Sequence, residues 1–364
     1  MNTPIMTQAA LETWLTNLLP AHDVIAPQQQ GAQIVFAPLS QAFSQKIAGA
    51  SDIAWNAGRT DLSAKEYFLP ASEAIITLRP GVFAENRPGV FAENRPGPGG
   101  LRVEAAHLAR PQVIFGARPC DGHALEVLDR LFLDDPVDVY YAERRAMTTM
   151  VGLACSDGPW TGCFCTALGG GPSDRTHLDI LLTACDGGFA VDVVTPKGRA
   201  LLEAGAAVLA SADVALSEPP AVTDLHLPDM TAWRAAFNAP YWAELAERCL
   251  GCRTCTYDCP VCYCFDVRDR VMGDGSIERL RCWDSCQGAL CFAIAGGHNP
   301  RPTQAARQRQ RYMHKFLYYP GREGAALCVG CGRCVEQCPV NIDIREVIGF
   351  VAANNRAATA EVQS

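Results

Sequence analysis

The sequence has little that suggests a membrane protein or a nucleic-acid-binding protein. No uninterrupted apolar run in its 364 residues is long enough to span a bilayer, and no charged-then-apolar leader follows Met1. The formal net charge is −8, and the one basic stretch, residues 301–311, is more typical of a solvated helix face or a partner contact. These absences predict a soluble, cytoplasmic protein.

Signatures of an enzyme active site are also scarce. No G-x-G-x-x-G pattern follows a predicted strand, so no dinucleotide site is indicated. No Ser/His/Asp set and no pair of carboxylates stands out, and the glycine run Gly169–Gly171 is weak support for a phosphate site. Chemistry on a substrate is therefore not indicated.

Cysteine, in contrast, is abundant. The chain holds 18 cysteines, far above ordinary usage, and it is too long to be a small disulfide-stapled scaffold. Without a secretory signal, cysteines at short spacing indicate metal ligation rather than disulfides. Hydrophobic residues make up 49% of the chain, which is enough for a sizeable core.

The chain divides into two expected domains. Residues 1–240 predict an α/β domain, because apolar runs of strand length alternate with helical patterns after an opening helix that Thr7 would cap. The strand-length runs are 33–36, 112–115, 148–154 and 189–194. A Pro-rich linker, residues 217–229, leads to residues 241–364, which predict a mainly α-helical, ferredoxin-like dicluster domain without strands.

Two cysteine patterns of the same spacing stand in the second domain. C-L-G-C-R-T-C-T-Y-D-C-P starts at Cys249 and C-V-G-C-G-R-C-V-E-Q-C-P starts at Cys328. Both follow the bacterial ferredoxin spacing, in which three cysteines of one loop bind one 4Fe-4S cluster and the fourth binds the other. The expected ligands are Cys249, Cys252, Cys255 and Cys338 for the first cluster, and Cys328, Cys331, Cys334 and Cys259 for the second.

This crossed ligation requires the two motifs to meet in space. The segment between them must leave and return, and we expect a helical excursion. The alternatives to the clusters are zinc, or cysteines that are merely buried. Zinc sites usually take their ligands in two pairs, which argues against zinc here.

Four cysteines of the first domain are candidate ligands of a third 4Fe-4S cluster. Cys120 follows the run 112–115, and Cys155 follows the run 148–154. If these two strands are parallel neighbours, their carboxyl ends face a common crevice where ligands bind. Cys163 and Cys165, in G-C-F-C, would complete the set there. The alternative is that all four pack as small hydrophobic side chains.

Three further cysteines lie close to the ferredoxin motifs in the sequence. Cys262, Cys264 and Cys286 either tune the nearby cluster through S–H contacts, ligate a group with an open position, or pack as ordinary buried thiols. Sequence alone leaves these alternatives open.

The remaining features are interpreted structurally. Cys185 is expected to serve in packing only, and His298 is expected to cap a loop rather than donate to a cluster sulfur. The octapeptide RPGVFAEN occurs twice without change, at 79–86 and 87–94. We interpret this tandem repeat as a duplicated surface loop, with partner binding as the lesser alternative.

Several pieces, taken in order, resemble a known family. They are F-G-A-R-P-C-D from Phe115, G-C-F-C from Gly162, C-P-V-C-Y-C-F-D from Cys259, R-C-W-D-S-C from Arg281, A-G-G-H-N-P-R-P from Ala295, and P-V-N-I-D-I after the second motif. The chain is similar over most of its length to the iron–sulfur beta subunit of cytoplasmic nickel–iron sulfhydrogenases, a relative of the electron-transfer subunit of anaerobic sulfite reductase. Cys291 and the tandem repeat are outside this resemblance.

The resemblance implies an electron-transfer subunit of an oxidoreductase complex rather than an enzyme by itself. Its implied partners are a flavin and NAD(P)H-binding subunit on one side, and a small cluster-bearing subunit with a nickel–iron catalytic subunit on the other. In the sulfite reductase relative, a sirohaem subunit is the distant partner instead of the nickel–iron subunit. Two alternatives are the electron-transfer subunit of an anaerobic sulfite or polysulfide reductase complex, and a reductase whose substrate site is the N-terminal cluster.

Overall fold

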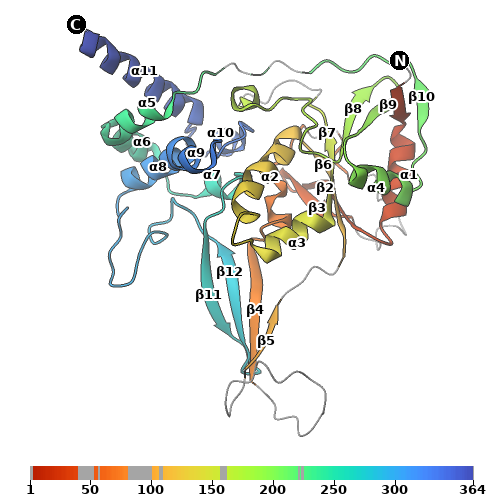
Figure 1. Ribbon diagram of the computed structural model, residues 1–364, viewed down its shortest axis with the longest axis horizontal. Coiled ribbons are helices and arrows are strands. Elements are labelled where there is room, and N and C mark those ends of the chain that lie inside the picture. The colour runs from red at the N-terminus through yellow and green to blue at the C-terminus, as the bar shows by residue number, and fades with distance from the viewer. Residues whose placement is uncertain are drawn as a thin grey trace.

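The computed structural model describes most of the chain. The described residues are 3–39, 53–55, 58–80, 101–105, 110–155, 162–219, 222 and 225–363. Within them, no helix is both long enough and apolar enough to cross a membrane. A large sheet with its helices forms one side of the molecule, the helices from α5 onward gather on the other side, and a narrow sheet extends away from both (Figure 1).

Strands come from both halves of the chain. They are β1 (Thr3–Met6), β2 (Asp23–Gln30), β3 (Gln33–Pro38), β4 (Ser72–Pro80), β5 (Leu101–Ala105), β6 (Gln112–Ala117), β7 (Thr148–Leu153), β8 (Ile180–Cys185), β9 (Gly188–Val193), β10 (Ala210–Ala212), β11 (Phe265–Val271) and β12 (Ile277–Trp283).

Helices become more frequent toward the C-terminus. They are α1 (Gln8–Leu18), α2 (Pro119–Phe132), α3 (Val139–Met147), α4 (Pro196–Ala204), α5 (Met230–Ala235), α6 (Tyr241–Arg248), α7 (Thr254–Tyr257), α8 (Gln304–Met313), α9 (Tyr319–Glu323), α10 (Arg333–Glu336) and α11 (Ile344–Gln363). Shorter helical turns are η2 (Ala64–Tyr67), η4 (Cys165–Leu168), η5 (Ala236–Asn238) and the π-helix η6 (His314–Tyr318).

The large sheet has the strand order β10-β1-β9-β8-β7-β6-β2-β3. Strands β2, β6, β7 and β8 are parallel to one another, and β1, β3, β9 and β10 pair antiparallel at the two ends. The four apolar runs expected to be strands coincide with β3, β6, β7 and β9. Strands β6 and β7 are direct neighbours, with Gln112 opposite Thr148, so their carboxyl ends lie together.

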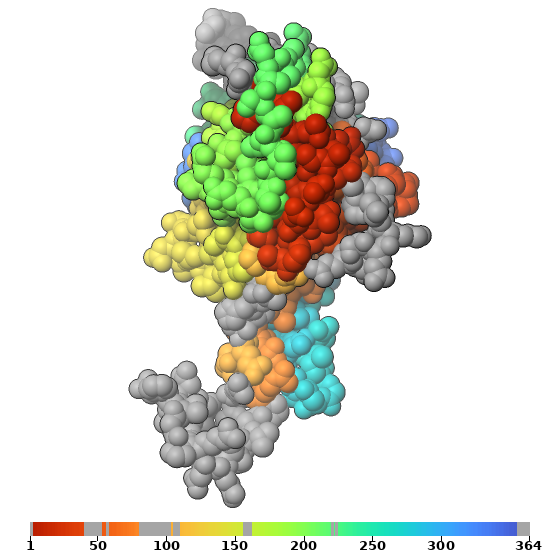
Figure 2. Space-filling model, turned by 90° about the vertical axis from the view of Figure 1, so that its right-hand side faces the viewer, coloured from red at the N-terminus to blue at the C-terminus, as the bar shows by residue number. Residues whose placement is uncertain are grey.

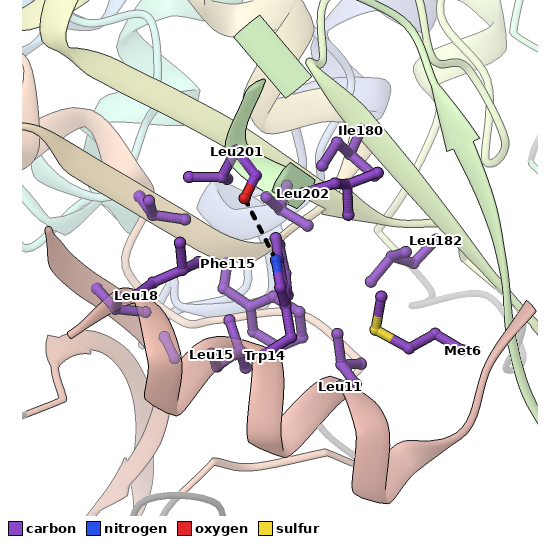
Figure 3. Packing of buried hydrophobic residues seen from close by; sticks show 14 of the residues in the cluster. Met6, Leu11, Trp14, Leu15, Leu18, Phe115, Ile180, Leu182, Leu201 and Leu202 are labelled. Atoms are coloured by element: carbon purple, nitrogen blue, oxygen red, sulfur yellow. Dashed lines mark hydrogen bonds between the residues drawn. The ribbon is translucent and has the colours of Figure 1, made fainter. Parts of the chain in front are cut away.

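Helices cover this sheet on both faces. Alternate residues of a strand point to opposite sides, so a strand with apolar residues at successive positions packs against helices on both. On β6, Phe115 packs with α1 and α4 on one face, while Ile114 packs with α2 on the other. Trp14 of α1 is central to the first face, and its indole N–H donates to the Leu201 carbonyl at 3.3 Å (Figure 3). Figure 2 shows the red N-terminal segment and the green segment that follows β8 packed against each other on this side.

The narrow sheet joins the two halves of the chain. Its order is β11-β12-β4-β5, and β12 pairs antiparallel with β4, so that Cys282 lies opposite Ser72. The prediction that strands are absent after residue 241 is therefore wrong. The segment between the two cysteine motifs begins with a β-hairpin and continues with α8, η6 and α9, so the expected helical excursion is wrong for its first part.

The sequence showed little sign of this hairpin because β11 is largely exposed, β12 is mostly half-buried, and both strands are rich in charged residues. Ion pairs across the strands take the place of apolar contacts: Arg279 pairs with Asp269 at 2.8 Å, and Arg270 pairs with Glu278 at 2.5 Å.

Residues 81–94 of the tandem repeat lie outside the described residues. The domain division at residue 240 and the mainly helical class of the second domain stay predictions.

Candidate metal centres

The two cysteine motifs fold into loops of the same shape. Cys249 follows α6 directly, and the first loop then leads into α7, whereas the second loop leads into α10. At the third position of each motif, Gly251 and Gly330 have φ values of +67° and +63°. At the fifth position, Arg253 and Gly332 have φ values of +71° and +76°. These left-handed residues turn the chain tightly around the space that the cysteines face.

The first cavity is lined by the cysteines expected for the first cluster. Its walls include Cys249, Cys252, Cys255 and Cys338, and Cys334 also reaches it. Neutral donors face the sulfurs: the amide of Gln304 donates to Cys249 Sγ at 3.1 Å, and the N–H of Ile342 donates to Cys338 Sγ at 3.2 Å. Cys252 is exposed, so this cavity lies at the molecular surface.

The second cavity is lined by the cysteines expected for the second cluster, which are Cys259, Cys328, Cys331 and Cys334. Here a charged donor is present, because Lys315 Nζ lies 3.3 Å from Cys259 Sγ and donates to the Leu327 carbonyl at 2.8 Å. Cys334 and Ile344 line both cavities, so the two lie next to each other.

The donor set fits 4Fe-4S clusters. All eighteen cysteines are free, and each cavity holds the three cysteines of one loop with the fourth cysteine of the other. Among the described residues, no group of three or more His, Cys, Asp or Glu side chains is arranged to hold a single metal ion. Ligands of a cluster stand farther apart, because each thiolate binds its own iron, whereas zinc gathers its ligands around one point.

The four N-terminal cysteines come together beside the second cavity. Cys120 lies in the first turn of α2, and Cys155 follows β7. The thiol of Cys163 donates to the Cys331 carbonyl at 3.4 Å. Burial raises the pKa of Cys120, and it raises the pKa of Cys165 to about 11; the nearby Cys155 thiolate adds to the rise in both. The four therefore share one neighbourhood, and their role as ligands stays a prediction.

A backbone contact holds the G-C-F-C loop against the second cysteine loop. The N–H of Phe164 donates to the Gly330 carbonyl at 2.8 Å. A Cβ on Gly330 would lie 2.6 Å from the amide nitrogen of Cys165, and one on Gly332 would lie 2.6 Å from the carbonyl carbon of Gly162. Only glycine allows this approach, which places the candidate third site against the second.

Buried cations surround the cysteines, and sequence reasoning missed them. Arg307 and Arg311 of the basic stretch are only 8% and 3% exposed, so its interpretation as a solvated helix face or partner contact is wrong for both. Burial opposes the charge of Arg311, but the thiolates of Cys255 and Cys334 raise its pKa. Arg311 and Lys315 are four residues apart and share a helix face. That spacing was visible in the sequence, but the thiolates facing it were not.

A further buried cation links the N-terminal and C-terminal parts of the chain. Arg333 is fully buried, and its guanidinium lies 2.9 Å from the Asp121 carboxylate and donates to the Thr60 carbonyl at 3.0 Å.

His298 and Cys185 lie apart from these groups. His298 is exposed, and its carbonyl closes a loop by accepting from the N–H of Ile294 at 2.9 Å, whereas Cys185 ends β8 at the edge of a turn.

Comparisons with known proteins agree with this geometry. Residues 248–342, which contain all eight motif cysteines, match a family model described as a 4Fe-4S dicluster domain. The chain therefore carries two 4Fe-4S clusters. It is 34% identical to sulfhydrogenase 2 subunit beta of Pyrococcus furiosus over 252 residues, which cover 66% of this chain and 73% of the relative. No solved structure matches the chain. The chain belongs to the sulfhydrogenase beta-subunit family, as an iron–sulfur electron-transfer subunit.

Proposed function

We propose that this chain relays electrons within an NAD(P)H-linked nickel–iron hydrogenase complex. Its partners are a flavin and NAD(P)H-binding subunit on one side, and a small cluster-bearing subunit with the nickel–iron catalytic subunit on the other. The observation that carries the proposal is the adjacency of the two cavities, which share Cys334 and Ile344 and each contain the four cysteines assigned to one cluster. Clusters bound there supply one-electron transfer over a short distance.

The ligand assignment is part of the proposal. Cys249, Cys252, Cys255 and Cys338 hold the first cluster, and Cys328, Cys331, Cys334 and Cys259 hold the second. The protein around them stabilises negative charge on sulfur: Gln304 and the Ile342 N–H donate in the first cavity, and Lys315 donates in the second. Free cysteines throughout the chain support a reducing, cytoplasmic location.

We also propose that Cys120, Cys155, Cys163 and Cys165 hold a third 4Fe-4S cluster. Its support is the contact of Cys163 with the Cys331 carbonyl, together with the glycine-dependent packing of the two loops. The three sites then form a row, from the exposed Cys252 through the second cavity to the carboxyl ends of β6 and β7.

Anaerobic purification of the complex with metal analysis tests these assignments. The expected result is nickel in a co-purifying subunit and about twelve irons per beta chain, taking four per cube. About eight irons would remove the third cluster alone. A sirohaem partner without nickel would move the chain to the sulfite reductase branch. Reductase turnover by the isolated chain with a chemical electron donor would contradict a purely relaying role.

A further inference from the structure

Three thiols outside the cluster motifs meet at the base of the β11–β12 hairpin. Cys264 directly precedes β11, and Cys286 comes shortly after β12. Strand pairing sets Phe265 opposite Trp283, and the N–H of Asp284 donates to the Cys264 carbonyl at 2.8 Å. The register of the hairpin therefore fixes Cys264 beside Cys286.

A turn brings the third thiol to the same place. The N–H of Gly288 donates to the Ser285 carbonyl at 2.7 Å, and the N–H of Cys291 donates to the Gly288 carbonyl at 3.3 Å. In the resulting arrangement the Cys264 thiol lies close enough to both Cys286 and Cys291 for each to act on its pKa. Cys264 is thus the shared member of two thiol pairs.

The three thiols run from the surface toward the first cavity. Cys291 is partly exposed, next to Leu290, which is 81% exposed. Cys286 is only 7% exposed, and its charge acts on Cys255 in the first cavity. The guanidinium of Arg253 covers the turn, since its Cζ would lie 3.3 Å from a Cβ on Gly288. A partly exposed thiol beside a cation is a setting in which cysteine reacts.

We propose that Cys291, Cys264 and Cys286 form a redox-active thiol relay that accepts a small disulfide from solution. The Cys291 thiolate attacks one sulfur of the small disulfide, forms a mixed disulfide and releases one thiolate. The Cys264 thiolate then attacks the Cys291 sulfur, which forms the Cys264–Cys291 disulfide and releases the second thiolate. Attack by Cys286 on Cys264 moves the disulfide inward and frees Cys291.

Reduction of the resulting Cys264–Cys286 disulfide to two thiols takes two electrons and two protons. The electrons come from the relay of the proposed function, and this last step alone rests on it. The disulfide-exchange steps before it need no electron from the clusters, so an experiment can test them independently of the proposed function.

Two other roles fit the three thiols less well. Within the described part of the chain, no cysteine group is arranged for a single metal ion, which argues against a site for one metal ion here. If the three thiols only packed in the interior, Cys291 would not need to be partly exposed beside Arg253. Cys282 is a matched control, because it also lies in the hairpin but contacts Ser72 Oγ at 3.4 Å instead of the relay thiols.

The test uses the full chain, kept anaerobic with its clusters, and glutathione disulfide as the probe. Alkylation and peptide mass spectrometry then locate each disulfide. The wild-type chain is expected to release two glutathione thiols for each internal disulfide formed, at Cys264–Cys291 or Cys264–Cys286. Cys264→Ser is expected to stop at a mixed disulfide on Cys291, with one glutathione released. Cys291→Ser is expected to lose the reaction, and Cys282→Ser is expected to react like the wild type.

Several results would overturn the relay. One is the same product from Cys264→Ser as from the wild type, and another is three thiols that stay unmodified in the wild type. If Cys264→Ser loses its iron, the result from Cys291→Ser is used instead, because its substituted side chain is partly exposed and should not disturb folding. An unchanged yield of internal disulfide in that variant would contradict entry at Cys291.

Discussion

The ammonium of Lys315 lies 3.3 Å from Cys259 Sγ, and the lysine side chain is almost fully buried in the π-helix η6. Burial alone would lower the pKa of Lys315, but the thiolates of Cys259 and Cys262 raise it above its ordinary value, so the lysine is charged. Short π-helices often mark functional positions. No charged side chain donates a described hydrogen bond to Cys249 or Cys338 in the first cavity.

We expect Lys315→Met to lower the reduction potential of the second cluster, because the cluster becomes more negative on reduction and loses a nearby positive charge. A unit charge roughly 5 Å away at an effective dielectric constant of about 20 is worth ~3 kcal/mol, which is on the order of 100 mV. A redox titration followed by electron paramagnetic resonance measures the shift. Lys315→Arg keeps the charge and should change the potential much less.

The control for this prediction is Gln304→Met in the first cavity. It removes a neutral donor to Cys249 Sγ and should shift only the first cluster, by a smaller amount. Equal potentials for Lys315→Met and the wild type would show that the buried ammonium does not set the potential.

Gly330 should tolerate substitution much less well than Gly251, although both stand at the same motif position. An alanine at either position has a left-handed φ, which costs about 1–2 kcal/mol. At Gly330 the new Cβ would also lie 2.6 Å from the backbone of Cys165, whereas at Gly251 the nearest atom is 3.7 Å away. The overlap should cost Gly330→Ala about 1–3 kcal/mol more.

Anaerobic denaturant unfolding of the two glycine variants measures this difference. A loss of iron limited to the N-terminal site of Gly330→Ala would add support for the third cluster. If Gly251→Ala is equally destabilised, the packing of the G-C-F-C loop on the second cysteine loop contributes nothing measurable.

The sequence was sufficient to predict the features that depend on local spacing. The ferredoxin spacing predicted which cysteines line each cavity, and apolar runs predicted β6 and β7 as strands. Partners distant in the chain were not predictable in this way. The hairpin is held by pairing with β4 and by charged pairs, and Lys315 of η6 faces Cys259, which lies after α7 and 56 residues earlier in the chain. Neither relationship leaves a periodic pattern in one segment.

The proposed thiol relay should speed up as pH rises. Although a hydrogen bond from Cys286 lowers the pKa of Cys264, the contact with Cys291 and burial raise it to about 11. Below that value the attacking thiolate is scarce, and its fraction grows roughly tenfold per pH unit. The conversion of the mixed disulfide on Cys291 to the internal disulfide should therefore be faster at pH 9 than at pH 7 by up to ~100-fold. Quenched-flow alkylation measures it, and a rate independent of pH would contradict attack by Cys264.

Crossed ligation predicts paired effects of two substitutions. Cys338→Ser should damage the first cluster, and Cys259→Ser should damage the second, even though each cysteine belongs to the other loop. Iron analysis and low-temperature electron paramagnetic resonance of each variant show which cluster is altered. Cys185→Ser, at the end of β8, is the control and should keep the full iron content. Damage confined to the cluster of the cysteine's own loop would rule out crossing.

Electron flow through the assembled complex is the decisive measurement for the proposed relay. Cys252→Ala and Cys331→Ala each remove one candidate ligand, from the first and the second cavity respectively. With NAD(P)H as the donor, electron delivery to the far subunit is expected to fall to background in both variants while the complex still assembles. Full electron flow in both variants would contradict a relay through these two centres.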